Sequence, residues 1–299
     1  AAFSQLNQLL KKRIGCPVVS IVHHLRSDEL RPRWQNSLYR MVERRYLLSV
    51  DGFIFNSEST KASVHGLCGG QLPMVVAHPG GNRLDPSVTK EDIIDRARQP
   101  GPIRVLFVGN VIRRKGLHVL LEALQKLPAG ACTLTIIGDL SIDKRYVREI
   151  LKQVDKNHPA NRMTILGAAS DEELTAQLKA AHVLAVPSSY EGFGIVYLES
   201  SGFGLPAIGS TAGGAGEIIT HGQDGFLISV DDVDSLAGRL YQLHQDRALL
   251  TAMSLNAFQR YQNHPTWQQT CGKITRFMES MAAGNGNCPC CTAAENKKD

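Results

Sequence analysis

At 299 residues the chain exceeds a typical single domain of about 100–200 residues, so we expect two domains with separate cores. Its 43% hydrophobic residues, 20% charged residues and 27 glycines exclude a disordered or fibrous protein and are typical of a globular protein rich in tight turns. No apolar run reaches about 18 residues, so the sequence predicts no membrane-spanning helix.

The net charge of +5 is concentrated near the N-terminus. Residues 1–50 hold nine Lys or Arg against three acidic residues, whereas the rest of the chain carries a net charge of −1. Interleaved with Trp34 and Tyr39, the arginines of this region could contact an anionic substrate or an anionic lipid surface; they are Arg26, Arg31, Arg33, Arg40, Arg44 and Arg45. A solvated helix face is the alternative, and we expect no nucleic-acid partner.

Residues 1–17, "AAFSQLNQLLKKRIGCP", have neither an initiator methionine nor the long apolar core of a signal peptide. They are typical of the middle of a helix. We therefore expect the chain to be an N-terminally incomplete copy of a longer protein.

Short β-branched runs predict nine strands, at residues 17–24, 52–57, 74–79, 103–110, 132–139, 162–167, 182–188, 206–210 and 225–229. Amphipathic segments at 117–127, 145–154, 171–181 and 234–246 each follow a predicted strand and have apolar residues at helical spacing. Alternating strands and helices predict an α/β fold whose parallel sheets are covered by helices on both faces.

The apolar pattern stops between about Leu84 and Pro102, which predicts a domain boundary there. We expect a first domain at 1–88, a polar linker at 89–102, a second domain at 103–265, a helix at 266–283 and a disordered tail at 284–299. The first domain has only three predicted strands, and a three-stranded open parallel sheet is marginal, which again suggests missing N-terminal residues.

The seven cysteines are an odd number and do not form a disulfide framework. Cys16, Cys68, Cys132 and Cys271 lie in apolar or helical contexts where reduced cysteine is common, which favours a cytoplasmic location. The tail sequence "CPCC" lacks the ligand spacing of a structural zinc site, and we expect no bound metal.

The first turn that could bind a ligand follows the strand at 103–108. Ligands of open parallel sheets bind beyond the carboxyl ends of the strands. Here the chain continues as Gly109, Asn110, Val111 and Ile112 and then as three cations, Arg113, Arg114 and Lys115, ahead of a helix that begins near Leu117. Cations beside helix N-terminal amides favour a phosphate site, and a solvated basic turn is the alternative.

The second turn is "YEGFGIVYLE", residues 190–199, after the strand at 182–188. Gly192 and Gly194 leave backbone amides open where a helix begins near Ile195, which favours a diphosphate. Glu199 could accept two hydrogen bonds from a vicinal diol such as a ribose, and Glu191 could do the same for a sugar. The alternatives are an acid that complements the helix dipole for Glu191 and an exposed helix residue for Glu199. However, Glu199 lies in a mostly apolar helix, where an unpaired carboxylate would be unfavourable.

Two further turns are less specific. Gly213, Gly214 and Gly216 precede Glu217 after one strand, and Gly138 and Asp139 follow another; both could be ordinary tight turns. We find neither Gly-x-Gly-x-x-Gly after a strand nor a P-loop, so a nicotinamide or flavin dinucleotide and nucleotide hydrolysis are disfavoured. The pattern favours a diphosphate and hydroxyl groups.

The segments "FVGNVIRRKGLHVLLEAL", "VPSSYEGFGIVYLESSGFGLPAI" and "STAGGAGEIITHGQDGFLI" together resemble the C-terminal half of retaining glycosyltransferases of the group 1 (family 4) type. The resemblance covers nearly all of residues 103–275. It implies the GT-B fold of two Rossmann-like domains, the second of which binds a nucleotide-diphosphate sugar. Glu191 and Glu199 fit the pair of glutamates, separated by seven residues, that marks the donor site of the family.

The resemblance also implies roles for single residues. Lys115 would bind the donor diphosphate together with the amides around Phe193, Gly194, Ile195 and Val196, Glu199 would hold the ribose, and Glu191 would lie near the transferred sugar. The family usually has an arginine where this chain has Asn110, so Arg113 or Arg114 would have to replace that cation. Donor-site residues are expected at Gly109, Asn110, Arg113, Arg114, Lys115, Gly138, Gly192, Phe193, Gly194, Ile195, Val196, Glu199, Gly214 and Glu217, with Lys115, Glu191 and His23 near the chemistry.

Residues 1–88 resemble the rear of the acceptor domain of the family, and His23 would lie at the interdomain cleft; a core or surface histidine is the alternative. The implied reaction is metal-independent hexosyl transfer with retention, by front-face attack of a glycan or lipid-linked acceptor, with no cofactor besides the donor substrate. A non-catalytic nucleotide-sugar-binding module and another GT-B enzyme, such as a sugar-nucleotide epimerase, are the alternatives. We expect a cytoplasmic protein that could bind peripherally to the inner membrane leaflet.

Overall fold

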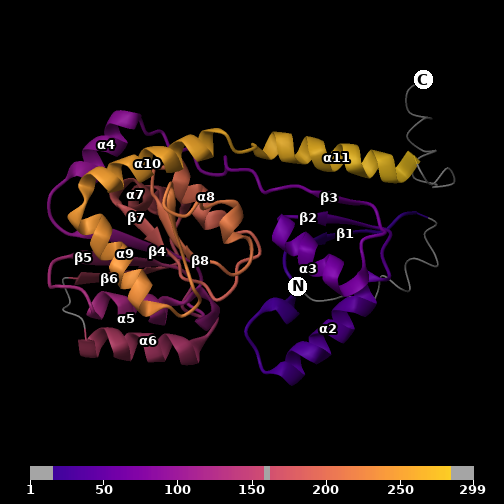
Figure 1. The fold of residues 1–299 in the computed structure, drawn as a ribbon, viewed down its shortest axis with the longest axis horizontal. Helices are drawn as coiled ribbons and strands as arrows, with labels where there is room; N and C mark the ends of the chain where they lie inside the picture. Colours follow the sequence, from indigo (N-terminus) through magenta and orange to yellow (C-terminus); the bar gives the residue numbers. More distant parts are fainter. Residues whose placement is uncertain (1–15, 158–161, 284–299) are drawn as a thin grey trace. The chain divides into compact units, whose positions relative to one another are not determined.

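A computed structural model describes residues 16–157 and 162–283, which form two compact units (Figure 1). The first unit comprises the chain up to Gly80 and from Pro265 onward, and the second comprises Gly81–His264. The helix expected near residue 1 and the tail expected at 284–299 lie outside the described residues. Within those residues, no helix is both long enough and apolar enough to cross a membrane.

The first unit contains a parallel sheet of three strands, β1 (Val19–Val22), β2 (Gly52–Phe55) and β3 (Met74–Val76), in the order β1-β2-β3. Its helices are the short 3-10 helix η1 (Arg26–Asp28), α2 (Arg33–Leu47), α3 (Glu58–Cys68) and α11 (Trp267–Ala283). A small core lies where the sheet packs on α2 and α3, and it includes Leu25, Leu47, Phe53, Phe55 and Val64.

The second unit contains a parallel sheet of six strands in the order β6-β5-β4-β7-β8-β9. The strands are β4 (Ile103–Val108), β5 (Cys132–Ile137), β6 (Met163–Gly167), β7 (Val183–Ala185), β8 (Ala207–Ser210) and β9 (Gly225–Ile228). All nine strands are therefore where the sequence predicts them. The chain starts this sheet at β4, builds outward through β5 and β6, and then returns to place β7 on the other side of β4. This reversal between β4 and β7 is the topological switch point of a doubly wound fold.

Helices cover both faces of the six-stranded sheet (Figure 1). The helices α5 (Leu117–Gln125), α6 (Lys144–Asn157) and α9 (Val233–Gln245) lie on one side, and α7 (Asp171–Ala180), α8 (Ile195–Gly202) and α10 (Arg247–Gln262) lie on the other. Burial on both faces explains the nearly continuous apolar sequence of β4, in which Ile103, Leu106 and Phe107 are fully buried.

The expected linker at 89–102 differs from the structure, because residues Lys90–Arg98 form the helix α4 of the second unit. Thr89 and Asp92 form a capping box at its start, and Ile93 and Ala97 are buried against the core. Arg96 is also buried, since its guanidinium donates to backbone carbonyls of the second unit. The boundary therefore lies earlier, between Gly80 and Gly81.

The helix α11 returns to the first unit. Thr270 Oγ1 donates to the carbonyl of His78 at 2.7 Å, and a Cβ atom added to Gly80 would lie 2.2 Å from the backbone nitrogen of Trp267. The chain therefore passes from one unit to the other twice, after Gly80 and before Pro265.

Of the four cysteines in the described part of the chain, Cys68, Cys132 and Cys271 are free, and Cys132 is buried, as expected. Burial raises the pKa of the Cys132 thiol to about 12. Cys16 is disulfide-bonded, so the expectation of a reduced thiol is wrong there.

Candidate active site

The loops after β4 and β7 meet at the switch point of the second unit. Gly116 has a left-handed backbone with φ of 73°, and a Cβ atom there would lie only 2.1 Å from the carbonyl oxygen of Pro187. The amide of Ser189 donates to the carbonyl of Arg114 at 2.8 Å. Glycine is therefore needed at position 116 for the two loops to touch.

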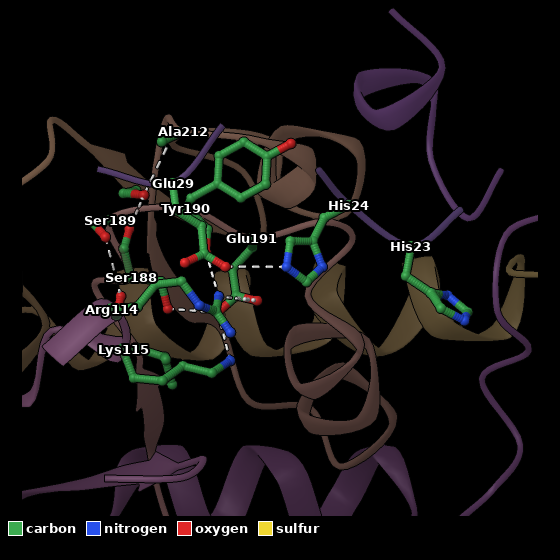
Figure 2. A network of polar contacts seen from close by, with 12 residues as sticks. His23, His24, Glu29, Arg114, Lys115, Ser188, Ser189, Tyr190, Glu191 and Ala212 are labelled. Carbon is green, nitrogen blue, oxygen red and sulfur yellow. Dashed lines mark hydrogen bonds and ion pairs between the residues drawn. The ribbon is translucent and has the colours of Figure 1, made fainter. Parts of the chain in front are cut away.

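Glu191 is the centre of a polar cluster formed by these two loops (Figure 2). Its Oε1 atom accepts from Lys115 Nζ at 2.5 Å and from Ser188 Oγ at 2.5 Å. Arg114 lies 3.6 Å from Oε2 and donates to the carbonyl of Tyr190 at 2.5 Å. The structure thus brings together three of the predicted residues, Lys115, Arg114 and Glu191, and adds Ser188, which the sequence did not single out.

The carboxylate of Glu191 is buried and ionised. Burial by itself raises its pKa, but the charge of Lys115, the hydrogen bonds from Lys115 and Ser188 and the charge of Arg114 together lower the pKa below its usual value. Two cations face one carboxylate in this cluster, which leaves one positive charge in excess at the carboxyl ends of β4 and β7. This excess favours an anionic ligand.

The loop after β8 supports Glu191 from its backbone side. Gly213 has φ of 80°, and a Cβ atom there would lie 2.0 Å from the carbonyl oxygen of Glu191. The amide of Gly214 donates to the same oxygen at 2.7 Å. The amide of Gly214, an expected donor-site residue, is therefore already hydrogen-bonded within the protein. Glu217 is half-buried and ends the 3-10 helix η4 (Gly214–Glu217).

At the N-terminus of α8, two backbone amides donate no hydrogen bond to the described residues. Gly194 is its N-cap in a left-handed conformation, and no side chain caps the helix. Within the described contacts the amides of Ile195 and Val196 donate no hydrogen bond, whereas the amide of Tyr197 donates to Gly194. Free amides at the positive end of a helix dipole are suited to a phosphate.

The other residues of the basic turn have different surroundings. Arg113 pairs with Glu149 at 3.1 Å and lies over the ring of Tyr146, both on α6. Asn110 is exposed. Gly138 allows close packing of two strand ends, because a Cβ atom there would lie 1.9 Å from the carbonyl oxygen of Gly109. Within the basic turn, Arg114 and Lys115 are therefore the cations directed to Glu191.

Glu199 has a partner that the sequence analysis did not find. Its Oε1 atom accepts from Arg83 Nε at 2.5 Å, and Arg83 also bonds to Asp171 Oδ1 at 2.7 Å. The apolar neighbours of Glu199 predicted that it needs a partner. Nothing in the spacing identified Arg83, which is 116 positions away in the chain.

Residues 88–260, more than half of the chain, match the sequence profile described as "Glycosyl transferases group 1". The chain belongs to the group 1 glycosyltransferases. This glycosyltransferase is 30% identical over 232 residues to D-inositol 3-phosphate glycosyltransferase of Pseudarthrobacter chlorophenolicus, covering 74% of the chain and 54% of that protein. It is 32% identical over 176 residues to glycogen synthase of Mycobacterium tuberculosis, covering 58% of the chain and 42% of that protein. The chain therefore spans about half the length of these curated relatives.

Solved structures show the fold of the glycosyltransferase. Sucrose-phosphate synthase of Thermosynechococcus elongatus superposes with a TM-score of 0.80 at 24% identity, covering 92% of this chain and 70% of that one. HepE of Anabaena, in complex with UDP and glucose, gives a TM-score of 0.74 at 23% identity, covering 91% and 73% of the two chains. The α/β architecture with parallel sheets is that of GT-B glycosyltransferases, as the sequence predicts.

His23 of the glycosyltransferase belongs to the first unit, where it follows β1 with an exposed side chain. Its carbonyl accepts from Thr60 Oγ1 at 3.2 Å. The neighbouring ring of His24 bonds to Glu29 at 3.2 Å, and the His23 ring points away from that pair (Figure 2). A catalytic role of His23 stays a prediction.

Proposed function

We propose that this glycosyltransferase transfers a hexose, with retention and without a metal ion, from a nucleoside diphosphate sugar to a glycan or lipid-linked acceptor. The observation that carries the proposal is the joining of Lys115 and Arg114 to the buried Glu191 at the switch point. The chain spans only about half the length of this relative, so the activity of the whole protein is also proposed and not shown.

The donor diphosphate would bind where positive charge collects. Lys115 and Arg114 supply the cations, and the amides of Ile195 and Val196 supply hydrogen bonds at the start of α8. The same groups would stabilise the charge that develops on the nucleoside diphosphate as it leaves, which is electrostatic catalysis of C–O cleavage. In a front-face reaction the departing phosphate helps to take the proton of the acceptor.

Glu191 would orient Lys115 and contact the transferred sugar. Its Oε1 atom is already bonded to Lys115 and Ser188, whereas Oε2 has the longer contact with Arg114 and retains capacity to accept a sugar hydroxyl. Glu199 would accept the two hydroxyls of the ribose. HepE in complex with UDP and UDP-glucose supports UDP as the first nucleotide to test.

Calorimetric titration with UDP, GDP and ADP tests the donor site. We expect one nucleotide to bind, and Lys115→Ala and Glu199→Ala each to weaken binding roughly 10- to 100-fold, as expected for loss of a charge-assisted hydrogen bond. Lys126→Ala is the matched control, because that lysine forms an exposed pair with Asp234. A folded protein that binds none of the three nucleotides would refute the donor site.

Turnover of a radiolabelled sugar nucleotide separates the three candidate functions. Transfer of the label to a glycan or lipid-linked acceptor supports the transferase. Binding without any turnover would favour the non-catalytic module, and an epimerised nucleotide sugar formed without acceptor would favour the epimerase.

We further propose that the protein is cytoplasmic and contacts an anionic inner membrane leaflet through α2. Trp34, Leu38 and Met41 recur at helical spacing and are 68%, 52% and 63% exposed. Arg33 and Arg40 belong to the same helix, so apolar and cationic groups are available together. Sedimentation with anionic vesicles should give salt-sensitive binding that weakens in Trp34→Ser; no binding at low salt would refute the contact.

A further inference from the structure

Arg83 joins two helices of the second unit through a single guanidinium. It lies between β3 and α4 and donates through Nε to Glu199 of α8 and through NH1 to Asp171, the first residue of α7. The Glu199 side chain is only 7% exposed, whereas that of Asp171 is 62% exposed. The bond to Glu199 is therefore the one that lies in a protected environment.

Arg83 is the only cation paired with Glu199 in the described part of the chain. A carboxylate this deeply buried would be unfavourable without a paired charge. The hydrogen bond to Glu199, opposed in part by burial, raises the pKa of Arg83, which keeps the guanidinium charged at all relevant pH.

The pairing leaves acceptor capacity on Glu199. A carboxylate has about four lone-pair sites. Arg83 Nε occupies one of them on Oε1, and Oε2 accepts no hydrogen bond from the described residues. This carboxylate, held in one rotamer, can therefore accept hydrogen bonds from two further hydroxyl groups, which is what binding a vicinal diol requires.

We propose that Arg83 is a positioning residue for ribose recognition: it pairs with the Glu199 carboxylate and holds it in the rotamer that accepts the ribose hydroxyls of the donor. The inference rests on the proposed function, since Glu199 must meet the ribose. Arg83 itself needs no contact with the nucleotide, and it acts through Glu199. Loss of Arg83 weakens binding of a ribonucleotide more than binding of its 2′-deoxy counterpart.

The test compares each of UDP, GDP and ADP with its 2′-deoxy counterpart in calorimetric titrations of the full chain. The wild type should prefer the best-binding ribonucleotide roughly 10- to 100-fold, as expected for one hydrogen bond to a charged group. Arg83→Ala should reduce this preference at least about fivefold, and Glu199→Gln should remove most of it. Arg83→Lys, which keeps a charge without the planar fork, should retain part of the preference.

Asp171→Asn is the matched control, because it removes the exposed partner of Arg83 and leaves the bond to Glu199. We expect it to keep the preference within about twofold. Circular dichroism establishes that each variant is folded, and Arg83→Lys carries the comparison if Arg83→Ala does not fold.

The outcomes distinguish the inference from the proposed function. Arg83→Ala could weaken binding of the ribonucleotide and of the 2′-deoxynucleotide equally while Glu199→Gln removes the preference. In that case Arg83 has only a structural role, and the inference is overturned while the proposed function stands. If the wild type has no preference, or Glu199→Gln keeps it, Glu199 does not bind the 2′-hydroxyl, and the inference is overturned together with the ribose role of Glu199. If the folded wild type binds none of the three nucleotides, the donor site of the proposed function fails as well.

Discussion

Replacing Lys115 by methionine tests whether its ion pair with Glu191 is needed for stability as well as for anion binding. The two charged atoms lie 2.5 Å apart, and the side chains are 14% and 8% exposed. Methionine keeps most of the aliphatic volume but leaves the carboxylate with one cation, Arg114, at 3.6 Å. In this variant the buried carboxylate of Glu191 therefore keeps its negative charge but loses its closest cation.

We expect the free energy of unfolding to fall by about 3 kcal/mol. Removing one partner of a buried pair costs about 3–5 kcal/mol, and the remaining contacts of Glu191 with Ser188 and Arg114 put this site at the lower end. Glu191→Gln removes the charge that Lys115→Met leaves behind. The double variant should therefore be at least about 1 kcal/mol more stable than the sum of the single losses predicts.

The pH dependence supplies a second test of the same pair. The partners of Glu191 lower its pKa in the folded state, so the pair stabilises the protein above the pKa of an unfolded glutamate, and this contribution disappears as the pH falls through the folded-state pKa. Lys115→Met should therefore lose less stability on acidification than the wild type.

Urea unfolding followed by circular dichroism is the assay, because both tryptophans, Trp34 and Trp267, belong to the first unit and report poorly on the second. Lys126→Met is the control, since its pair with Asp234 is 49% and 82% exposed and should contribute less than about 1 kcal/mol. Strictly additive losses in the double variant would refute an interaction between Lys115 and Glu191.

Three further predictions concern the scaffold of the second unit. Burial lowers the pKa of His182 to about 3, so between pH 6.5 and 3 the unfolded chain binds a proton that the folded chain does not bind. The free energy of unfolding should therefore fall by about 2 kcal/mol from pH 7 to 5. His182→Gln should reduce this pH dependence in urea titrations. Arg96→Met removes bonds of 2.7 and 2.9 Å to the carbonyls at the end of α8 and should lower stability by about 3 kcal/mol, whereas an unchanged melting temperature would contradict that role. Gly116→Ala should weaken both stability and binding of the nucleotide that the titrations identify. Gly130→Ala, which has a similar φ of 82° but open space around it, should lose only about 1–2 kcal/mol from backbone strain and should keep nucleotide binding; equal effects of the two changes would refute the loop contact.

The parallel sheet explains why much of the site could be predicted. Lys115 and Glu191 each follow a buried strand, and the carboxyl ends of neighbouring parallel strands meet at one edge. Apolar periodicity therefore predicted the strands, and the strands predicted that these two residues gather at one edge.

Pairings between distant polar residues could not be predicted in the same way. Arg96 lies in the segment that was expected to be a polar linker, and Arg83 lies shortly before it, in the expected first domain. In the structure each guanidinium is instead satisfied by acceptors that are far away in the sequence, Glu199 in one case and the carbonyls of Phe203 and Gly204 in the other. The hydrogen-bond acceptors of these two guanidinium groups can be identified only from the folded structure.

The two passages of the chain between the units run beside each other. Gly80 packs on Trp267 within the first unit, and a Cβ atom on Gly81 would lie 3.1 Å from the ring of Tyr261 within the second. The first and last residues of the second unit therefore lie close together, as they do in a domain that is inserted into a loop of another domain. Adjacent ends are the geometry that tolerates transplantation and circular permutation. Residues 81–264 accordingly form one segment that could be exchanged between related enzymes at two junctions.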